Sequence, residues 1–324
     1  MGGKLLARFP RLNSSVGKTM PADKTMRFFK SIFLVLLTLV AIGFSGSTSE
    51  GANTCGYDLA SPDAIYMLPD PLQEISGLTY LDKASVACIQ DENGIIYIYD
   101  LISNQIQTER KFGDDGDYEG IAKVDNTIYV LRSDGNLFEI IDYSFVTPKV
   151  NFYKTNLPSK NNEGLCYDAR NNRLLIAAKS KSGKGRGYKE SRMVYEFALK
   201  TRSMKAEPVF IFDIQTIIAF ADSLGIDLPM KKNKKGDTSK PKIKLGTSAI
   251  GIHPVTGKLY LLSATDYLLF IFNMDGNVEH VEQLDPNLFN KAEGITFNEE
   301  GDLFISNEGE GKRATILQFS YHGR

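Results

Sequence analysis

The sequence predicts an all-β fold, a β-propeller of five blades, and three observations support this prediction. The first is an internal repeat that opens with an acidic residue, a glycine and an apolar residue. The second is the strand pattern that follows each opening, and the third is a lone strand before the first repeat. Repeats of about 40 to 45 residues built from antiparallel strands are typical of propeller blades.

The repeat opening is intact at three places, where a glutamate directly precedes Gly120, Gly164 and Gly294. Two degenerate openings carry Ser76 and Ile250 in place of the glutamate. The glycines recur about every 43 residues, except for one interval of about twice that length before the opening at Ile250. That interval holds either one repeat and an insertion or two repeats of which one has decayed, so six blades are the alternative to five.

Each opening leads into a short apolar strand, a polar turn and two further strands. β-Branched and aromatic residues fill the strands, and Asp, Asn and Gly occupy the turns, as in antiparallel hairpins. We expect the second strands at 85–90, 127–132, 173–178, 258–263 and 302–306, and the third strands at 95–99, 136–141, 193–199, 267–272 and 314–319.

The apolar stretch 64–68 precedes the first repeat without a hairpin partner of its own, and the last repeat ends after three strands near Tyr321. We therefore expect the N-terminal strand to complete the C-terminal blade. This closure would remove the exposed strand edges of an open ring.

The N-terminal region contains a candidate export segment. Arg27 and Lys30 precede an apolar run that ends in small residues, which is typical of a secretory signal peptide. The run is also nearly long enough to remain as an N-terminal membrane anchor, which needs roughly 20 apolar residues. Cys55 follows it, although Ala52-Asn53-Thr54 is a poor match to the pattern of lipid attachment. We assign 1–25 to an additional leader, 26–48 to the signal peptide or anchor, 49–61 to a linker and 62–322 to the propeller.

The composition excludes several classes of protein. Lys and Arg total 38 against 39 Asp and Glu, so no nucleic-acid partner is indicated, and we expect a monomer. Three cysteines in an exported chain exclude a dense disulfide framework, and Cys88 and Cys166 fall on predicted strands, where we expect buried thiols.

An insertion over 214–245 separates the third repeat from the fourth. Its first part has apolar residues on one face of a short helix, and its second part, 231–244, holds seven lysines with Gly, Ser and Pro. We expect a mobile loop there, and contact with anionic lipid or polysaccharide is the alternative.

In a propeller the first strand of each blade lines the central channel, so Glu119, Glu163 and Glu293 should converge at one mouth. Polar residues near the ends of the second strands should face the same mouth. The candidate ligand-binding residues are Asp91, Glu92, Arg132, Asp134, Lys179, Asp266 and Glu308.

Carboxylates that converge in one funnel repel each other unless something compensates their charge. A hard cation such as Ca²⁺, which takes about six to eight oxygen ligands, would do so, with Glu119, Glu163 and Glu293 as the candidate metal ligands. Lys179, Arg132 or raised pKa values are the other means of compensation. The structural alternative is that each glutamate caps strand backbone and pairs with a neighbouring base; no cofactor other than Ca²⁺ is indicated.

Several ordered motifs resemble the SdiA-regulated family of bacterial envelope proteins. The motifs are Glu74-Ile-Ser-Gly-Leu-Thr-Tyr, Gln90-Asp91-Glu92-Asn93-Gly94, Gly116-Asp117-Tyr118-Glu119-Gly120-Ile121-Ala122, Asn162-Glu163-Gly164-Leu165-Cys166-Tyr167 and Ala292-Glu293-Gly294-Ile295. The resemblance covers about 62–321. It implies a β-propeller exported to the periplasm or anchored at the cell membrane of a bacterium, and it implies little chemistry.

Two functions follow from this reading. The preferred one is a non-catalytic envelope propeller that binds a ligand or protein partner at the channel mouth, with or without a bound cation. The alternative is a calcium-dependent hydrolase of esters, lactones or phosphoesters, with Glu163 and Glu293 as metal ligands and Lys179 or Asp91 assisting; its layout is similar to that of calcium-dependent lactonases and phosphotriesterases, a fold-level analogy.

A hydrolase built on a Ser-His-Asp triad is not expected. The sequence has no Gly-x-Ser-x-Gly elbow and no histidine pair at metal-ligand spacing. Each of its three histidines has another explanation: His253 precedes a proline in a turn, His280 follows a charged strand, and His322 is near the C-terminus.

Overall fold

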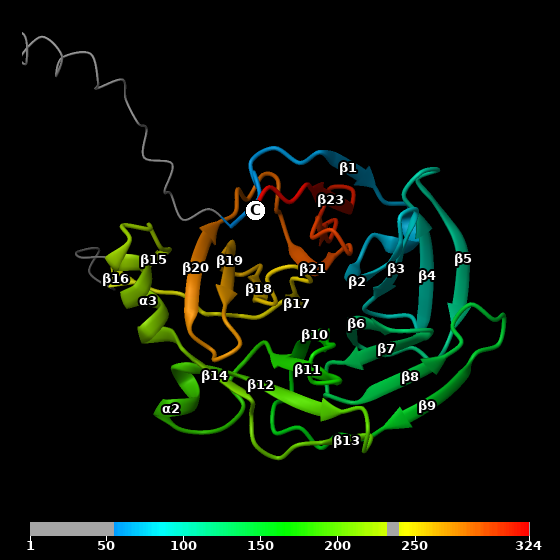
Figure 1. The fold of residues 1–324 in the computed structure, drawn as a ribbon, viewed down its shortest axis with the longest axis horizontal. Helices are drawn as coiled ribbons and strands as arrows, with labels where there is room; N and C mark the ends of the chain where they lie inside the picture. Colours follow the sequence, from blue (N-terminus) through cyan, green and yellow to red (C-terminus); the bar gives the residue numbers. More distant parts are fainter. Residues whose placement is uncertain (1–54, 232–239, 324) are drawn as a thin grey trace, which may run out of the picture. The chain divides into compact units, whose positions relative to one another are not determined.

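The five repeats form five antiparallel sheets around a central channel in a computed structural model that describes residues 55–231 and 240–323 (Figure 1). The candidate export segment at 26–48 and most of the lysine-rich stretch lie outside the described residues. Among the described residues, no helix is long and apolar enough to cross a membrane. The prediction of an all-β propeller with five blades is confirmed.

Each blade starts with its innermost strand, and the following strands step outward in chain order, except that the outermost strand of blade five comes from the N-terminal side. Blade one comprises β2 (Ile75–Asp82), β3 (Ser85–Gln90), β4 (Ile95–Asp100) and β5 (Gln105–Lys111). Blade two comprises β6 (Tyr118–Val124), β7 (Thr127–Arg132), β8 (Leu137–Ile141) and β9 (Lys149–Tyr153). Blade three comprises β10 (Asn162–Asp168), β11 (Arg173–Ala178) and β12 (Ser191–Ala198), with β13 (Ser203–Met204) and β14 (Phe210–Asp213) both paired to β12.

Blade four comprises β17 (Ala249–Ile252), β18 (Leu259–Ser263), β19 (Leu268–Phe272) and β20 (Val278–Gln283). Blade five comprises β21 (Ala292–Phe297), β22 (Leu303–Asn307), β23 (Thr315–Phe319) and the N-terminal β1 (Ala64–Met67). A short helix, α2 (Arg186–Lys189), precedes β12, and a 3₁₀ turn, η1 (Asp70–Leu72), joins β1 to β2.

The ring closes as the sequence predicts. β1 pairs antiparallel with β23, with Ala64 opposite Gln318 and Met67 opposite Thr315 (Figure 1). The N-terminal strand thus becomes the outer strand of the last blade, and the two ends of the propeller hold each other through backbone hydrogen bonds.

The residues before β1 also belong to the propeller. The stretch 55–61, expected as part of a linker, places the buried side chains of Cys55, Tyr57 and Leu59 in the core shared by blades four and five. The Tyr57 hydroxyl donates a hydrogen bond to the carbonyl oxygen of Gly301, at 2.5 Å. Burial of these apolar side chains is the physical reason that the packed unit begins before residue 62.

The long interval between repeats is one repeat and an insertion, so the alternative of a sixth blade is excluded. The predicted helix is α3 (Ile214–Ser223), which begins where the Asp213 carboxylate accepts a hydrogen bond from the backbone N–H of Thr216, at 2.8 Å. Its buried face, Ile214, Ile217 and Ala221, packs into the core around blades three and four. The remaining strands, β15 (Met230–Lys231) and β16 (Lys240–Pro241), form a separate two-stranded ribbon.

The repeat glycines mark where neighbouring inner strands approach most closely. A Cβ atom placed on Gly120 would lie 2.8 Å from Leu165 Cβ and 2.9 Å from the Glu163 carbonyl oxygen of the next blade. The same relation continues around the ring, because each repeat glycine faces the inner strand of the following blade and Gly294 of the last blade faces Leu78 of the first. The absence of side chains at these positions permits the ring to close at this diameter.

The two cysteines predicted on strands are buried free thiols, as expected. Cys88 and Cys166 lie in the packed faces of blades one and three.

We predict that Gly120→Ala destabilises the propeller by about 2 kcal/mol, because the added methyl group overlaps the backbone of the next blade. This loss corresponds to a fall in Tm of roughly 4 to 8 °C, measured by thermal unfolding. Gly187→Ala in α2 is the control, because a Cβ there meets nothing within 4 Å. Equal Tm values for the two variants would contradict the close-approach argument.

Candidate functional site

The glutamates of the three intact openings sit on β-bulges. The register between β6 and β7 shifts between Tyr118 and Gly120, which leaves Glu119 as the extra residue. Glu163 and Glu293 occupy the same position in the bulges of blades three and five. A bulge re-aims the side chain of its extra residue, so the repeat presents each carboxylate in the same way.

The two degenerate openings behave differently. Ser76 also sits in a bulge, but its hydroxyl donates a hydrogen bond to the carbonyl oxygen of Tyr118, at 2.7 Å, and thereby joins blade one to blade two. The pairing of β17 with β18 runs through Ile250 without a shift. The ring therefore carries a glutamate before the repeat glycine on three of its five inner strands, and the site is asymmetric.

Glu119, Glu163 and Glu293 line a constriction of about 10 Å³ at the start of the inner strands. Lys179, which follows β11, places its ammonium group 2.7 Å from Glu163 Oε1. We call these four residues the acidic mouth. Glu163 and Glu293 are buried, and Glu119 is half-buried.

The electrostatics of the acidic mouth favour protonation of its carboxyls. Burial, followed by the charge of Glu163 and further carboxylates, raises the pKa of Glu119 to about 9. Burial and the charge of Glu163 raise the pKa of Glu293 to about 7. The pKa of Glu163 is also raised by burial, although Lys179 opposes the shift. Lys179, and Lys291 beside Glu293, therefore compensate only part of the negative charge that these three groups would carry if ionised.

One carboxylate oxygen in the acidic mouth has no partner. Glu163 Oε2 is buried and accepts no hydrogen bond, while the other oxygen of the same group binds Lys179. Buried polar atoms in folded proteins almost always have partners. This oxygen is therefore available to a cationic or hydrogen-bonding ligand.

Several other candidate residues form an outer rim beside the acidic mouth. On this rim, Glu308 forms an ion pair with Lys291, whose Nζ lies 3.9 Å from Glu293 Oε1. Asp91 is half-buried with its Oδ1 unpaired, and burial together with Glu92 raises its pKa. Glu92 is exposed.

The remaining candidates make internal contacts instead. Arg132 and Asp134 form an ion pair with each other at 2.8 Å, and the guanidinium lies 5.8 Å from the centre of the Phe138 ring. The Asp266 carboxylate accepts hydrogen bonds from the backbone N–H groups of Lys244 and Leu245, at 2.9 and 2.8 Å. Asp266 thus fixes the end of the insertion, and we do not retain these three residues in the candidate site.

The geometry of the three glutamates sets a condition on metal binding. The ligand oxygens of these three carboxylates do not all lie within 4.8 Å of one another. A cation held by all three would require their side chains to rotate inward.

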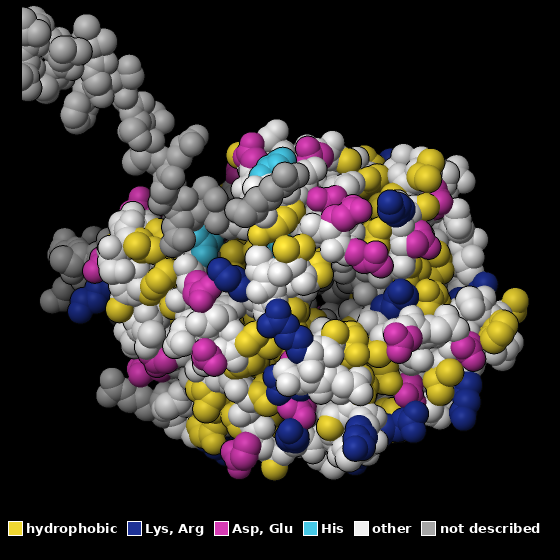
Figure 2. Space-filling view, viewed as in Figure 1, with side chains coloured by type: hydrophobic (Ala, Val, Ile, Leu, Met, Phe, Trp, Pro, Cys, Tyr) yellow, Lys and Arg dark blue, Asp and Glu magenta, His cyan; other side chains and the backbone are white. Residues whose placement is uncertain are grey.

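Around the central hollow on the face shown in Figure 2, acidic and basic side chains are interspersed, so no field of a single sign covers it.

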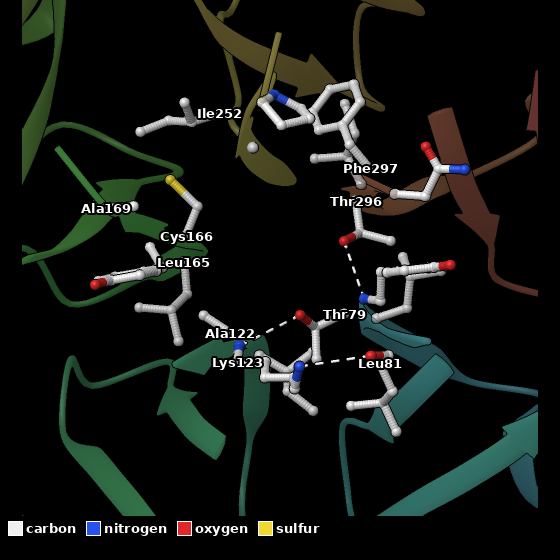
Figure 3. Close-up of a pocket in the computed structure, with 18 of the residues that line it drawn as sticks. Thr79, Leu81, Ala122, Lys123, Leu165, Cys166, Ala169, Ile252, Thr296 and Phe297 are labelled. Atoms are coloured by element: carbon white, nitrogen blue, oxygen red, sulfur yellow. Dashed lines mark hydrogen bonds between the residues drawn. The ribbon is translucent and has the colours of Figure 1, made fainter. Parts of the chain in front are cut away.

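A second opening, which was not predicted from the sequence, lies at the other end of the inner strands. A pocket of about 470 Å³ is lined there by residues from all five blades, among them Thr79, Lys123, Cys166, Ile252 and Phe297 (Figure 3). Hydrogen bonds join neighbouring blades in its wall: Lys123 N–H donates to Thr79 Oγ1, at 3.3 Å, and Tyr80 N–H donates to Thr296 Oγ1, at 3.1 Å.

A sequence signal for this pocket was present in four of the five repeats, as an apolar residue directly after the repeat glycine. An apolar ring separates the pocket from the acidic mouth, because the same five residues line both: Leu78, Ile121, Leu165, Ile250 and Ile295. Four of them follow a repeat glycine, whereas Ile250 precedes one in the blade that lacks a bulge.

Comparisons with known proteins show the fold and leave the activity open. No family model matches the chain, and no curated protein matches it in sequence. The glutaminyl cyclase of Myxococcus xanthus is 14% identical, with 80% of this chain and 95% of that chain covered and a TM-score of 0.52. The PQQ-bound aldose sugar dehydrogenase of Streptomyces coelicolor is 11% identical, with 80% of this chain and 99% of that chain covered and a TM-score of 0.48.

A streptogramin B lyase structure is 10% identical, covering 79% of this chain and 96% of that chain, with a TM-score of 0.46. The likeness to the cyclase supports the propeller fold. Propellers serve enzymes and binding proteins alike, so activity has to be argued from the site. The resemblance to the SdiA-regulated family stays a prediction.

We predict that Glu119→Gln makes the protein more stable at alkaline pH. The folded protein binds more protons than the unfolded chain between the ordinary pKa of 4.5 and about 9, so the free energy of unfolding falls as pH rises through this window. The variant should be more stable than the wild type by about 1 to 2 kcal/mol at pH 9, since each pKa unit is worth about 1.4 kcal/mol and partial exposure screens the effect.

Denaturant unfolding at pH 5, 7 and 9 measures this difference, which should shrink towards zero at pH 5. Glu109→Gln, on the exposed outer strand of blade one, is the control and should show no pH-dependent gain. A gain for Glu119→Gln that is the same at every pH would contradict the raised pKa.

Proposed function

We propose that this chain is a non-catalytic β-propeller of the bacterial cell envelope that binds a ligand or partner through a cation at the acidic mouth. The observation that carries the proposal is the set of bulge-presented carboxylates, which share a constriction and include one buried oxygen without a partner. This arrangement costs stability when the groups ionise, and a bound cation would recover that cost.

The residues present fit a hard cation. Carboxylate oxygens are the ligands that Ca²⁺ prefers, and the constriction of about 10 Å³ is of the order of a single water molecule or ion. Glu163 and Glu293 would supply ligands from the buried side, and Glu119 would do so after losing its proton. A cation held there would offer its remaining coordination positions to oxygen-rich groups of an envelope ligand.

The location in the envelope is part of the proposal. It is supported by the basic and apolar pattern of 26–48 and by the motifs that resemble the SdiA-regulated family. If the apolar segment is retained, it would hold the propeller at the membrane.

We predict that Ca²⁺ raises the Tm of the purified protein and that a chelator reverses the rise. At a free concentration of about a hundred times the dissociation constant, the rise should be roughly 5 to 10 °C. Affinity should increase between pH 6 and pH 8, because Glu293, with a pKa of about 7, must lose its proton to bind the cation.

Glu163→Gln should abolish the response to Ca²⁺, whereas the control Glu109→Gln should retain it. Titration calorimetry on the same three proteins measures the stoichiometry directly. A folded wild-type protein that binds no Ca²⁺, or a response that persists in Glu163→Gln, would refute a cation at the acidic mouth.

The second candidate is the metal-dependent hydrolase, and one observation favours it. Glu119 is a carboxyl group that burial keeps protonated near neutral pH, close to the lysine of the acidic mouth. Such a group could donate a proton to the leaving oxygen of an ester, with Lys179 or Asp91 assisting. A bound cation would supply Lewis-acid polarisation of the substrate oxygen.

The hydrolase predicts metal-stimulated turnover of esters, lactones or phosphoesters. In that case Glu119→Gln should lower kcat by about a hundredfold or more, because it removes the general acid. A broad substrate panel assayed with and without Ca²⁺ tests this. Binding of Ca²⁺ without turnover on any substrate would favour the non-catalytic function.

A further inference from the structure

A second group of metal-ligating side chains lies away from the channel. The ligand atoms of Cys55, His280 and Glu282 all lie within 4.8 Å of one another, and the three form the sole such group of His, Cys, Asp and Glu among the described residues. Cys55 precedes β1 in the chain, whereas His280 and Glu282 lie on β20, the outer strand of blade four. His280 was expected to follow a strand, but it lies within one.

The fold explains why these residues meet. His280 and Glu282 are two positions apart on a strand, so their side chains emerge on the same face of the sheet. Their cross-strand partners, Ile271 and Leu269, belong to the core that also holds Cys55. The Tyr260 hydroxyl donates a hydrogen bond to the Cys55 carbonyl oxygen, at 3.2 Å, and fixes this part of the backbone against blade four.

The histidine is held in a position suited to coordination. His280 Nε2 lies 2.8 Å from Glu282 Oε2, and its other ring nitrogen, Nδ1, is buried without a hydrogen-bond partner. The His280 side chain is 9% exposed and the Glu282 side chain is 37% exposed. The group is therefore anchored in the core on one side and open to solvent on the other, which provides an entry path for an ion.

We propose that Cys55, His280 and Glu282 form a Zn²⁺ site. A thiolate, an imidazole and a carboxylate are the three ligand types that Zn²⁺ uses in proteins, at bonds of about 2.0 to 2.3 Å. Tetrahedral coordination at these bond lengths places the ligand atoms about 3.5 Å apart, a separation that small side-chain rotations reach from the observed arrangement. The thiol loses its proton on binding, and water takes the fourth position.

The ligand set distinguishes this site from the acidic mouth. A sulfur and a nitrogen ligand favour borderline-soft transition metals over Ca²⁺, whereas the mouth offers carboxylate oxygens. The site is independent of the proposed function. Its consequence is structural: the ion would tie the segment before β1 to the outer strand of blade four, next to the blade that β1 completes.

The test begins with metal analysis of the purified full chain, in mild detergent if the N-terminal segment requires it. We expect one equivalent of Zn²⁺ after dialysis and a fall in Tm of roughly 5 °C or more on chelation, restored by added Zn²⁺. Replacement of Zn²⁺ by Co²⁺ should produce the thiolate-to-cobalt charge-transfer absorption that reports a cysteine ligand.

Cys55→Ala should lose the charge-transfer band, and His280→Gln should lower metal affinity at least tenfold. Cys166→Ala and His322→Gln are the matched controls, because these residues lie outside the group, and both should keep one equivalent of metal. Glu163→Gln should keep the zinc as well, which separates this site from the acidic mouth.

A folded wild-type protein that binds no Zn²⁺ would overturn the proposal. Metal bound without the charge-transfer band would overturn the cysteine as a ligand, and with it the proposed site. If Cys55→Ala does not fold, the Co²⁺ spectrum of the wild-type protein and of His280→Gln decides the outcome.

Discussion

The close approach of the five inner strands is the constraint on which the rest of this structure depends. Strands that converge on one axis leave no room for a side chain where each passes its neighbour, and the repeat glycines meet this requirement. Gly120 lies against the backbone and Leu165 of the next blade, and the relation continues around the ring to Gly294 and Leu78. Immediately beside these contacts, the apolar ring lies in the channel between its two ends.

The same convergence creates the chemistry of the acidic mouth. A bulge beside the glycine aims each glutamate towards the axis, where burial and mutual repulsion make ionisation costly. Lys179 offsets one charge through its ion pair with Glu163, and the raised pKa values of Glu119 and Glu293 offset more. The geometry that serves packing thereby places carboxyl groups with raised pKa values at one end of the channel.

Closure of the propeller involves more than one strand. β1 supplies backbone hydrogen bonds to β23, and the residues before it bury Tyr57 and Leu59 between blades four and five. The proposed zinc site would add a coordination bond from the same segment to β20. Each of these links joins residues that are more than two hundred positions apart in the chain, so together they hold the two ends of the domain against fraying.

The sequence by itself determined the propeller fold, its closure and the sharing of one mouth by three glutamates, because repeat period and strand alternation are properties of neighbouring residues. The choice of five blades over six needed the tertiary structure, which shows that the long interval holds an insertion. Tertiary structure alone decided which polar groups remain available. Asp266 is occupied by the end of the insertion, Arg132 by Asp134, and Cys55 meets His280 and Glu282. The tertiary structure also formed the pocket at the other end of the inner strands from the acidic mouth. These contacts join distant segments whose separation depends on how blades pack, and no local pattern encodes that distance.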